Sequence, residues 1–441
     1  MTTSACVIGL GKLGSPLAAC LAAKGINTVG VDVDPHKIEA LNRGESPVHE
    51  PGMEQMLARA GKRLTATQHI EVGVCASEIT FIVVSTPSES DGGFSLRYVL
   101  PACEAIGRAL AAKSEYHVVV LTSTVMPGTT GGPVREALER ASGKKCGEDF
   151  GLCYSPEFIA LGSVIRDFLN PDMLLIGESD ARAGSSLESL YLSVVENKPS
   201  VARMNWVNAE ITKLAVNTYV TTKISFANML ARVAERLPGA NVDVITSALG
   251  LDTRIGPKYL KGAISYGGPC FPRDNLAMSA LARKLGAPAD LSQTVDMFNR
   301  GQVRWLAEVV ESHLHNGGRV GILGLTYKPS TDVVEEAVGF LLAKELLRRG
   351  KKVIAYDPAG QGNTAKVLGE SVAFASKPEE CVRQSDVVVL ATPWQEFSAI
   401  ALTQWGRPGN PRVVVDCWRV LKQVAGQEGV RYVGLGMGAT G

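Results

Sequence analysis

The chain has 441 residues, 45% of them hydrophobic and 20% charged, and its 45 basic and 44 acidic side chains leave a formal net charge of +1. This balance is that of a globular protein with a sizeable core, and it lacks the basic excess that is typical of nucleic-acid binders. The nine cysteines are scattered through apolar runs, as in a reduced cytoplasmic protein. No Cys/His cluster has zinc spacing, and no apolar run reaches the roughly 18 residues of a membrane helix. We therefore expect a cytoplasmic protein without a metal, a nucleic-acid partner or a membrane anchor.

The first part of the chain alternates strand-like and helix-like segments. Short runs rich in Val and Ile predict strands, and the amphipathic stretches between them predict helices. The predicted strands are 5–8, 28–32, 79–84, 117–122 and 173–177, and the predicted helices are 17–24, 97–113, 134–141 and 181–194. Such alternation predicts a parallel sheet covered by helices on both faces.

A helical middle follows, and the alternation then returns. One long helix is predicted over 205–236, with Pro238-Gly239 as its stop signal, and shorter helices over 242–249, 275–285 and 301–315. Further strands are predicted at 319–323, 353–356, 387–391 and 412–416, residues 360–363 as a surface loop, and the Gly-rich end, 434–441, as a loose segment. The layout is α/β, helical, then α/β, with domain boundaries at 1–200, 201–305 and 306–441.

A glycine motif, Gly9-Leu10-Gly11-Lys12-Leu13-Gly14, directly follows the first predicted strand and opens the first helix. Gly9 permits a tight turn, Gly11 lets the backbone approach a pyrophosphate, and Gly14 allows the helix to pack closely on the strand. The helix N-terminus also favours negative charge. The alternative is that these glycines form an ordinary βα turn.

Two side chains after the second predicted strand bear on the identity of the cofactor. Asp32 ends that strand, where a carboxylate accepts hydrogen bonds from ribose hydroxyls and repels a 2′-phosphate. NAD is therefore favoured over NADP as the cofactor, although Lys37 leaves NADP open. Two later strands end in Ser85-Thr86-Pro87 and Ser123-Thr124-Val125. Because ligands bind outside the carboxyl ends of such strands, Thr86, Pro87 and Thr124 are candidates to line the cofactor cleft, with ordinary strand-end turns as the alternative.

A cysteine stands in a tight loop that runs from Tyr266 to Asp274. Gly267-Gly268-Pro269 precede Cys270, and Arg273-Asp274 follow it. Such a loop holds a thiol in a fixed, accessible place, and a nearby cation favours the reactive thiolate. From the loop alone the alternative stays open that Cys270 is a small buried hydrophobe.

Polar residues on the predicted long helix form a second candidate. Glu210, Lys213 and Asn217 share one face of that helix. The face is either solvated or directed into a cleft, where a desolvated lysine stabilises an oxyanion. In Tyr154-Ser155-Pro156-Glu157-Phe158, Glu157 follows an apolar strand, and a partly buried carboxyl with a raised pKa can act on water.

Taken together, these motifs resemble the UDP-glucose/GDP-mannose dehydrogenase family over nearly the whole chain, from Gly9 to Arg419. The matching segments, in the order of the family, are the glycine loop, 50–52, 123–128, 156–158, 209–213 with Asn217, 254–256, 267–272 and 324–328. The resemblance implies two Rossmann-like parallel-sheet domains joined by a long central helix and a helical dimerisation core.

The resemblance also implies the reaction. Family members oxidise the primary alcohol of a nucleotide sugar to a carboxylate in two NAD-dependent steps. By similarity, Cys270 would attack the aldehyde to give a thiohemiacetal, and a second oxidation would leave a thioester that water hydrolyses. Lys213 would steady the oxyanion, Asp274 and Thr124 would organise water and proton transfers, and Glu157 would assist hydrolysis.

The substrate positions implied by the resemblance lie in all three regions. Arg254 would reach the substrate of a neighbouring subunit, which implies a homodimer at least. The other positions are Glu157, Phe158, Lys213, Asn217, Lys261, Tyr266, Gly267, Tyr327, Lys328 and Arg419.

Four residues depart from the family pattern. Leu161 stands where Glu is common, Glu335 where Arg is common, Pro269 where Ser is usual and Ser155 where Asn is usual. The sequence Cys-Phe-Pro-Arg-Asp is closer to the UDP-glucose type than to N-acetyl-sugar types, so UDP-glucose is the first substrate that we expect. The alternatives are GDP-mannose or another UDP-hexose, a two-electron β-hydroxyacid dehydrogenase, and a non-catalytic nucleotide-sugar binder.

Overall fold

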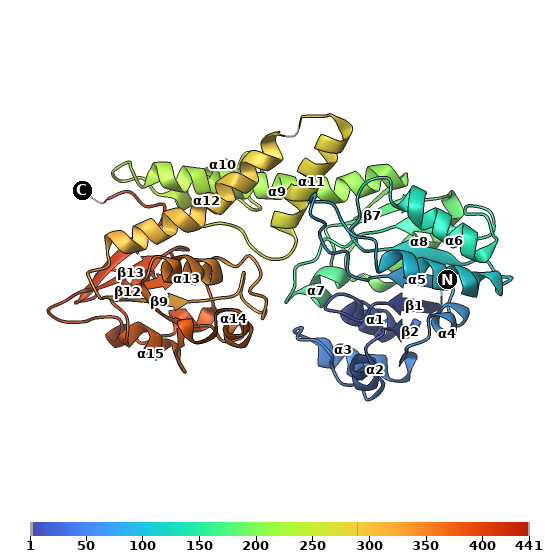
Figure 1. The fold of residues 1–441 in the computed structure, drawn as a ribbon, viewed down its shortest axis with the longest axis horizontal. Helices are drawn as coiled ribbons and strands as arrows, with labels where there is room; N and C mark the ends of the chain where they lie inside the picture. Colours follow the sequence, from blue (N-terminus) through green and yellow to red (C-terminus); the bar gives the residue numbers. More distant parts are fainter. Residues whose placement is uncertain (1–2, 289, 440–441) are drawn as a thin grey trace. The chain divides into compact units, whose positions relative to one another are not determined.

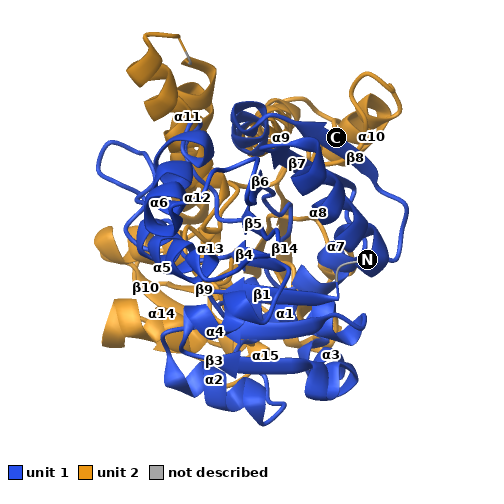
Figure 2. Ribbon diagram, turned by 90° about the vertical axis from the view of Figure 1, so that its right-hand side faces the viewer, with its two compact units in different colours: residues 1–215 blue, residues 216–441 orange. Residues whose placement is uncertain are grey.

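The structure is a computed structural model that describes residues 3–288 and 290–439. The chain divides into two compact units, unit 1 (Met1–Ala215) and unit 2 (Val216–Gly441), coloured separately in Figure 2. The helix α9 (Trp206–Ala234) crosses the boundary between them, and Figure 1 follows the elements along the chain. Each unit is built around its own sheet.

Unit 1 contains an eight-stranded sheet in the order β3-β2-β1-β4-β5-β6-β7-β8. All neighbouring strands are parallel except β6 and β7, which pair antiparallel. The strands are β1 (Ser4–Ile8), β2 (Asn27–Val31), β3 (Leu64–Thr67), β4 (Ile79–Ile82), β5 (Val118–Leu121), β6 (Gly151–Tyr154), β7 (Met173–Glu178) and β8 (Ser200–Met204). The strand order reverses direction at β1 and β4, and ligands bind at such a switch point in open α/β sheets.

Helices bury both faces of this sheet. In β5, Val118 and Val120 pack into the core with α1, α3, α7 and α8, while Val119 and Leu121 pack with α4, α5 and α6. This double burial explains the continuous apolar run of the strand. The helices are α1 (Gly14–Ala23), α2 (Pro35–Asn42), α3 (Met53–Ala60), α4 (Ile70–Cys75), α5 (Val99–Ala111), α6 (Arg135–Ser142), α7 (Val164–Leu169) and α8 (Ala181–Val194), with short turns η1 (Gly61–Arg63) and η2 (Thr130–Val134).

Unit 2 contains a six-stranded, fully parallel sheet in the order β11-β10-β9-β12-β13-β14. The strands are β9 (Arg319–Leu323), β10 (Lys352–Tyr356), β11 (Ala373–Phe374), β12 (Val387–Leu390), β13 (Arg412–Asp416) and β14 (Val430–Gly434). In β12, Val387 and Val389 pack with α12 and α13, whereas Val388 and Leu390 pack against α15 and α16 on the other face.

Along the chain, the helices of unit 2 either precede that sheet or alternate with its strands (Figure 1). They are α10 (Val242–Gly250), α11 (Phe271–Leu285), α12 (Asp290–Ser312), α13 (Val338–Arg348), α14 (Gln361–Leu368), α15 (Pro378–Arg383) and α16 (Gln395–Ser398), with turns η3 (Gly369–Ser371), η4 (Leu402–Gln404) and η5 (Lys422–Val424). Within the described ranges, no helix combines the length and the apolar character that a membrane crossing requires.

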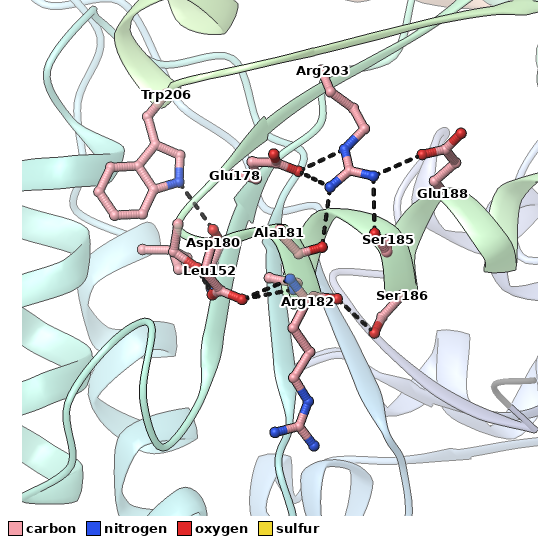
Figure 3. Close-up of polar contacts among 12 residues, drawn as sticks. Leu152, Glu178, Asp180, Ala181, Arg182, Ser185, Ser186, Glu188, Arg203 and Trp206 are labelled. Carbon is pink, nitrogen blue, oxygen red and sulfur yellow. Dashed lines mark hydrogen bonds and ion pairs between the residues drawn. The ribbon is translucent and has the colours of Figure 1, made fainter.

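An ionic cluster anchors the start of α9 in unit 1 (Figure 3). Arg203, at the end of β8, donates to Glu178, Glu188, Ser185 and the carbonyl of Ala181, over 2.8–3.0 Å. Trp206, the first residue of α9, donates from its indole nitrogen to the carbonyl of Leu152 over 2.9 Å. A planar guanidinium with every donor satisfied fixes direction as well as position. The first turns of α9 are thereby held against the sheet of unit 1.

The expected fold of two parallel-sheet α/β domains with a long central helix is confirmed. Two local expectations are wrong. Residues 360–363 do not form a loop, because Gly360 is the N-cap of α14. The Gly-rich end is packed as far as it is described, because Gly436 donates to the carboxylate of Glu235 over 2.8 Å and Gly438 to the carbonyl of Ala240 over 2.9 Å. The last two residues of that end lie outside the described ranges.

Candidate active site

The glycine loop lies between β1 and α1 of unit 1. Gly9 has φ +98°, and a Cβ there would stand 2.6 Å from the carbonyl oxygen of Val83. A Cβ on Gly14 would overlap the carbonyl of Gly9, whereas a Cβ on Gly11 would meet nothing within 4 Å. Gly9 and Gly14 therefore allow backbone segments to approach each other closely, and Gly11 leaves open space beside the N-terminus of α1.

Asp32 connects this loop to the second strand. Its carboxylate accepts from the backbone N–H of Leu10 over 2.6 Å and from that of Asp34 over 2.9 Å. Lys37 donates to the same carboxylate over 3.1 Å, and the Asp32 side chain is 8% exposed. Asp32 thus shapes the loop, and Lys37 places a positive charge beside it. Lys12 and Leu13 are half-buried at the start of α1.

The carboxyl ends of β4 and β5 are tied together by hydroxyl groups. Thr86 is buried and donates to the carbonyl of Thr124 over 2.8 Å, and Ser123 donates to the carbonyl of Val84 over 2.6 Å. Thr124 and Pro87 are half-buried beside them. The two strand-end motifs from the sequence therefore form one continuous rim.

Glu210 connects α9 to the loop after this rim. It is fully buried, and its carboxylate accepts from the N–H groups of Gly128 and Thr130 and from the hydroxyl of Thr130, over 2.6–2.7 Å. Burial raises the pKa of this carboxyl, while the three hydrogen bonds act in the opposite direction. The sequence singled out Glu210 by its helical spacing but gave it no partner.

One turn further along α9, Lys213 meets the segment after β6. Its ammonium donates to the backbone carbonyl of Glu157 over 2.6 Å and lies 4.7 Å from the centre of the Phe158 ring. Only 8% of Lys213 is exposed. An ammonium has three donors, so two N–H groups are available to a further oxygen.

The side chain of Glu157 is desolvated. It borders a small cavity whose other walls are mostly apolar, among them Leu13, Val83 and Phe168. Loss of water raises the pKa of Glu157 to about 7, with the Lys213 ammonium opposing the shift. A carboxyl that titrates near neutral pH is suited to accept a proton from water.

Cys270 occupies the N-cap position of α11 in unit 2, and its thiol is exposed. Of the described cysteines only Cys75 is also exposed. The partial positive charge of a helix N-terminus favours an anion at this position. Cys270 is therefore accessible, as the sequence predicted.

Asp274 lies one turn into α11 and is 1% exposed. Its carboxylate accepts from the amide of Asn217 over 2.5 Å, and the guanidinium of Arg273 lies 3.8 Å away. The structure therefore joins two of the predicted catalytic residues, one from α9 and one from the cysteine loop.

The Gly-Gly pair before Cys270 packs against the loop that follows β9. A Cβ on Gly267 would overlap the carbonyl of Glu336, and one on Gly268 would stand 2.8 Å from the Tyr327 ring. Gly268, with φ +84°, donates to the carbonyl of Glu335 over 3.1 Å. Glu335, one of the departures from the family pattern, thus contributes its backbone here, and its side chain is exposed.

Tyr266 is fixed from both sides of its backbone. Asn299 on α12 accepts from its N–H over 2.9 Å and donates to its carbonyl over 3.0 Å. Asn275 donates to its hydroxyl over 3.3 Å and to the hydroxyl of Thr221 over 2.9 Å. The sequence gave no role to Asn275 or Asn299, since single asparagines inside helical patterns carry no signal of their own.

The remaining predicted substrate positions differ in exposure. Lys261 is exposed and Lys328 is half-buried. Arg254 is exposed and forms an ion pair with Asp252 at 2.6 Å. Arg419 is instead enclosed: its side chain is 0% exposed, and its guanidinium binds Asp243 at 2.8–2.9 Å and the carbonyls of Gly262 and Leu435 at 2.6–2.7 Å.

The structure also shows the environments of Ser155 and Leu161, two further departures from the family pattern. Ser155 is buried and bonds to the carbonyl of Leu175 over 2.9 Å and to the hydroxyl of Tyr191 over 3.1 Å. Leu161 is half-buried in a loop that Glu50 holds, because the Glu50 carboxylate accepts from the N–H groups of Gly162 and Val164 over 2.7–2.9 Å. The structure gives no account of Pro269. No group of three or more potential metal ligands is present among the residues it describes.

Models of the UDP-glucose/GDP-mannose dehydrogenase family match three successive parts of the chain. The NAD binding domain matches residues 3–195, the central domain 207–301, and the UDP binding domain 321–423. A UDP-glucose 6-dehydrogenase of Haloferax volcanii is 34% identical over 97% of this chain and 99% of its own length. A GDP-mannose 6-dehydrogenase of Azotobacter vinelandii is 32% identical over 90% and 92%.

A solved structure shares the fold closely. The UDP-glucose dehydrogenase of the archaeon Pyrobaculum islandicum superposes with a TM-score of 0.90 at 37% identity, over 99% of this chain and 98% of that one. The family matches define an NAD-dependent dehydrogenase of nucleotide sugars, with the glycine loop in unit 1 and the exposed Cys270 at the N-cap position of α11 in unit 2. The chain belongs to the UDP-glucose/GDP-mannose dehydrogenase family.

Proposed function

We propose that this enzyme oxidises the C6 alcohol of UDP-glucose to the carboxylate of UDP-glucuronate through a covalent intermediate on Cys270. The observation that carries the proposal is the exposed Cys270 thiol at the N-cap of α11, one turn before the buried Asp274–Asn217 pair. An oxidation that stops after two electrons needs no such nucleophile. This speaks against a two-electron β-hydroxyacid dehydrogenase and against a non-catalytic binder.

The choice of UDP-glucose is supported by the relatives. A model described as a UDP binding domain matches residues 321–423. The relatives from Haloferax volcanii and Rhizobium meliloti, which align over 97% and 98% of this chain, are both named UDP-glucose 6-dehydrogenases. GDP-mannose is the alternative substrate, since GDP-mannose 6-dehydrogenases are 32–33% identical over 87–90% of the chain.

The residues of unit 1 suit NAD. The open space beside Gly11 and the N-terminus of α1 would receive the pyrophosphate, Asp32 and Lys37 would hold the adenosine ribose, and Thr86, Pro87 and Thr124 would border the nicotinamide end. NAD held there would supply the hydride acceptor for both oxidations at C6. Asp32 disfavours a 2′-phosphate at that ribose.

Cys270, in unit 2, performs the covalent step. The Cys270 thiolate adds to the aldehyde carbon, so that a C–S bond forms and the carbonyl π pair moves to oxygen. The two available N–H groups of Lys213 are suited to stabilise that oxygen. Holding the aldehyde as a thiohemiacetal prevents its loss and leaves a carbon that can be oxidised again. The chemistry requires that Cys270 and Lys213 reach the same substrate carbon.

Hydrolysis completes the reaction. Water adds to the thioester carbonyl and loses a proton, the C–S bond breaks, and the Cys270 thiolate leaves. Glu157 is the base that we assign to this proton, because its pKa is raised to about 7. Asp274, held by Asn217, and Thr124 would orient the water.

We also propose that the enzyme works as a homodimer or larger oligomer in the cytoplasm. The exposed guanidinium of Arg254 suits a contact with the substrate of a neighbouring subunit. Mass measurement by light scattering tests the assembly: a monomer at assay concentration would contradict it.

A panel of UDP- and GDP-sugars with NAD, monitored for NADH, tests the substrate. We expect UDP-glucose to give the highest kcat/KM and two NADH per sugar. A preference for GDP-mannose would move the assignment to the alternative substrate. One NADH per sugar, or none with any nucleotide sugar, would reject the four-electron reaction.

A further inference from the structure

A groove runs between α12 and α13 in unit 2, and apart from Tyr266 none of its lining residues is a predicted cofactor or substrate position. Its volume is about 390 Å³, which is within the range of small-molecule sites. The charged side chains that line it are Arg300, Arg304, Lys344, Arg348, Glu336 and Glu345. Four cations therefore face two carboxylates.

Part of this charge is neutralised within the unit. Arg300 binds Asp296 at 2.8 Å, and Glu345 binds both Arg348 and Arg349 at 2.8 Å. Arg304 and Lys344 are exposed, one on each helix, and neither makes an ion pair or hydrogen bond with any residue that the structure describes. The groove thus presents two cations without an ion pair from opposite walls, and the carboxylate of Glu336 also lines it.

The floor of the groove includes a polar group without a bond. Ser265 is 6% exposed and lines the groove, and its buried hydroxyl has no hydrogen-bond partner within the described part of the chain. A buried hydroxyl left unpaired costs roughly 1–3 kcal/mol.

The groove also touches the cysteine loop. Tyr266 and Asn299 line it, and they are joined by the two backbone hydrogen bonds that fix Tyr266. Glu336 lines it as well, and its carbonyl packs directly on Gly267. A ligand in the groove would therefore contact Tyr266, which is four positions before Cys270.

We propose that this groove binds a small phosphate-bearing anion and that the bound anion alters the conformation of the Cys270 loop. The guanidinium of Arg304 and the ammonium of Lys344 provide a fork and a point charge, the two modes by which proteins bind phosphate. The ligand is an effector that is chemically distinct from the sugar being oxidised. The site does not depend on which nucleotide sugar is the substrate.

Calorimetric titration of the full chain with inorganic phosphate at constant ionic strength tests the site. NAD and UDP are present at saturation, so that phosphate cannot report on their sites. We expect saturable binding that is at least tenfold weaker in Arg304→Ala/Lys344→Ala and is retained in the charge-preserving Arg304→Lys/Lys344→Arg. Lys62→Ala/Arg63→Ala, which removes two exposed cations from unit 1, serves as the control and is expected to bind like the wild type.

Equal affinity in all four proteins, or no saturable binding, would overturn the proposal. Titrations with AMP and with glucose 6-phosphate under the same conditions distinguish free phosphate from a nucleotide or a sugar phosphate as the source. Melting curves of each variant show whether weaker phosphate binding is caused by unfolding of that variant.

The coupling to the loop has its own readout. The rate at which iodoacetamide alkylates Cys270, followed on its peptide by mass spectrometry, is expected to change saturably with phosphate in the wild type and in the Lys62/Arg63 control. In Arg304→Ala/Lys344→Ala the midpoint is expected to shift at least tenfold. The coupling would be rejected if the alkylation rate did not change with phosphate, or if its dependence on phosphate were the same in that variant as in the wild type.

Discussion

The environment of Glu157 affects two groups: it positions the Lys213 ammonium, and it raises the pKa of the Glu157 carboxyl. The backbone carbonyl of Glu157 accepts a hydrogen bond from the Lys213 ammonium, while its side chain borders a small cavity with Leu13 and Phe168. The ammonium is therefore positioned without being neutralised by the carboxylate. The apolar surroundings raise the pKa of Glu157 to about 7. At neutral pH the same residue can hold or release a proton.

The raised pKa predicts the pH dependence of turnover. If Glu157 must be deprotonated to activate water, kcat rises with pH and reaches half of its plateau near pH 7. Glu157→Gln is expected to lower kcat by at least a hundredfold and to remove this acidic limb. Steady-state rates from pH 5.5 to 9 measure it, and an unchanged acidic limb in Glu157→Gln would assign the titration to another group.

The same shift predicts an effect on stability. The folded carboxyl keeps its proton up to about pH 7, whereas the unfolded one loses it near 4.5. The folded state therefore binds more protons between these values, and its stability falls as pH rises through them, by up to about 3 kcal/mol. Melting temperatures at pH 5 and pH 8 should differ less in Glu157→Gln than in the wild type. Glu71→Gln, on the exposed face of α4, is the control.

Among the elements, α9 contributes the largest number of attachments to the candidate site. Its first residue is held by Leu152, its buried Glu210 clamps the loop at Gly128 and Thr130, and the next turn presents Lys213. Two of these attachments come before Lys213 on the helix. The height and rotation of the lysine are therefore set by buried polar bonds as well as by packing.

Removal of the clamp should affect both stability and turnover. Glu210→Ala leaves the buried N–H and hydroxyl of Thr130 and the part-buried N–H of Gly128 without their acceptor. We expect it to lower the free energy of unfolding by about 3 kcal/mol. Denaturant titration measures this loss. kcat should fall more than the affinity for NAD, because Lys213 shifts. Wild-type stability in Glu210→Ala would contradict the clamp.

The glycine loop gives a prediction with an internal control. Gly14→Ala places a methyl group against the Gly9 carbonyl, and we expect a loss of about 2–4 kcal/mol in the free energy of unfolding. Gly11→Ala meets nothing within 4 Å, so its melting temperature should stay within a degree of the wild type while its KM for NAD rises about tenfold or more. The reverse pattern would mean that Gly11 has a structural role and not a ligand-facing one.

At the scale of the whole molecule, unit 2 depends on one buried cation. Arg419 binds Asp243 at the start of α10 and the carbonyls of Gly262 and Leu435, so it joins the helical segment to the end of the sheet. Removing one partner of a fully desolvated charge pair leaves the other partner buried without compensation, which lowers the stability strongly. The enclosure of Arg419 supports a role in holding unit 2 together, in addition to the substrate contact implied by the family resemblance.

Arg419→Ala should therefore destabilise the protein without ligand. We expect a loss of about 3–5 kcal/mol in the free energy of unfolding, measured by denaturant titration. Arg254→Ala removes an arginine from the surface and should leave that free energy within about 0.5 kcal/mol of the wild type. Equal stability of the two variants would contradict the structural role of Arg419.

The sequence predicted the architecture well because period and composition are local signals. The strands 319–323 and 412–416 and the helix 181–194 were predicted with the bounds that the structure has. The start of α14 was mistaken for a loop because Gly360 and Gly362 suppress the helical pattern. The Asp357 carboxylate, which accepts from the N–H of Gly360 just before this helix, was not recognised as a signal.

The candidate site could be predicted only in part. Motifs pointed to Cys270, Lys213 and Glu157 because reactive groups occur in recognisable local settings. The clamp of Glu210 on Thr130 and the hold of Asn299 on Tyr266 join residues 80 and 33 positions apart. No local pattern encodes such pairs, so their partners emerged only from the fold.

The most direct test of the covalent mechanism is the number of NADH molecules formed per UDP-glucose by Cys270→Ala under single-turnover conditions, with the wild type alongside. We expect two NADH and one UDP-glucuronate in the wild type, together with a Cys270-linked acyl adduct detectable by mass after an acid quench. Cys270→Ala is expected to yield no carboxylate. Two NADH and a full equivalent of the acid from Cys270→Ala, at the wild-type rate, would contradict it.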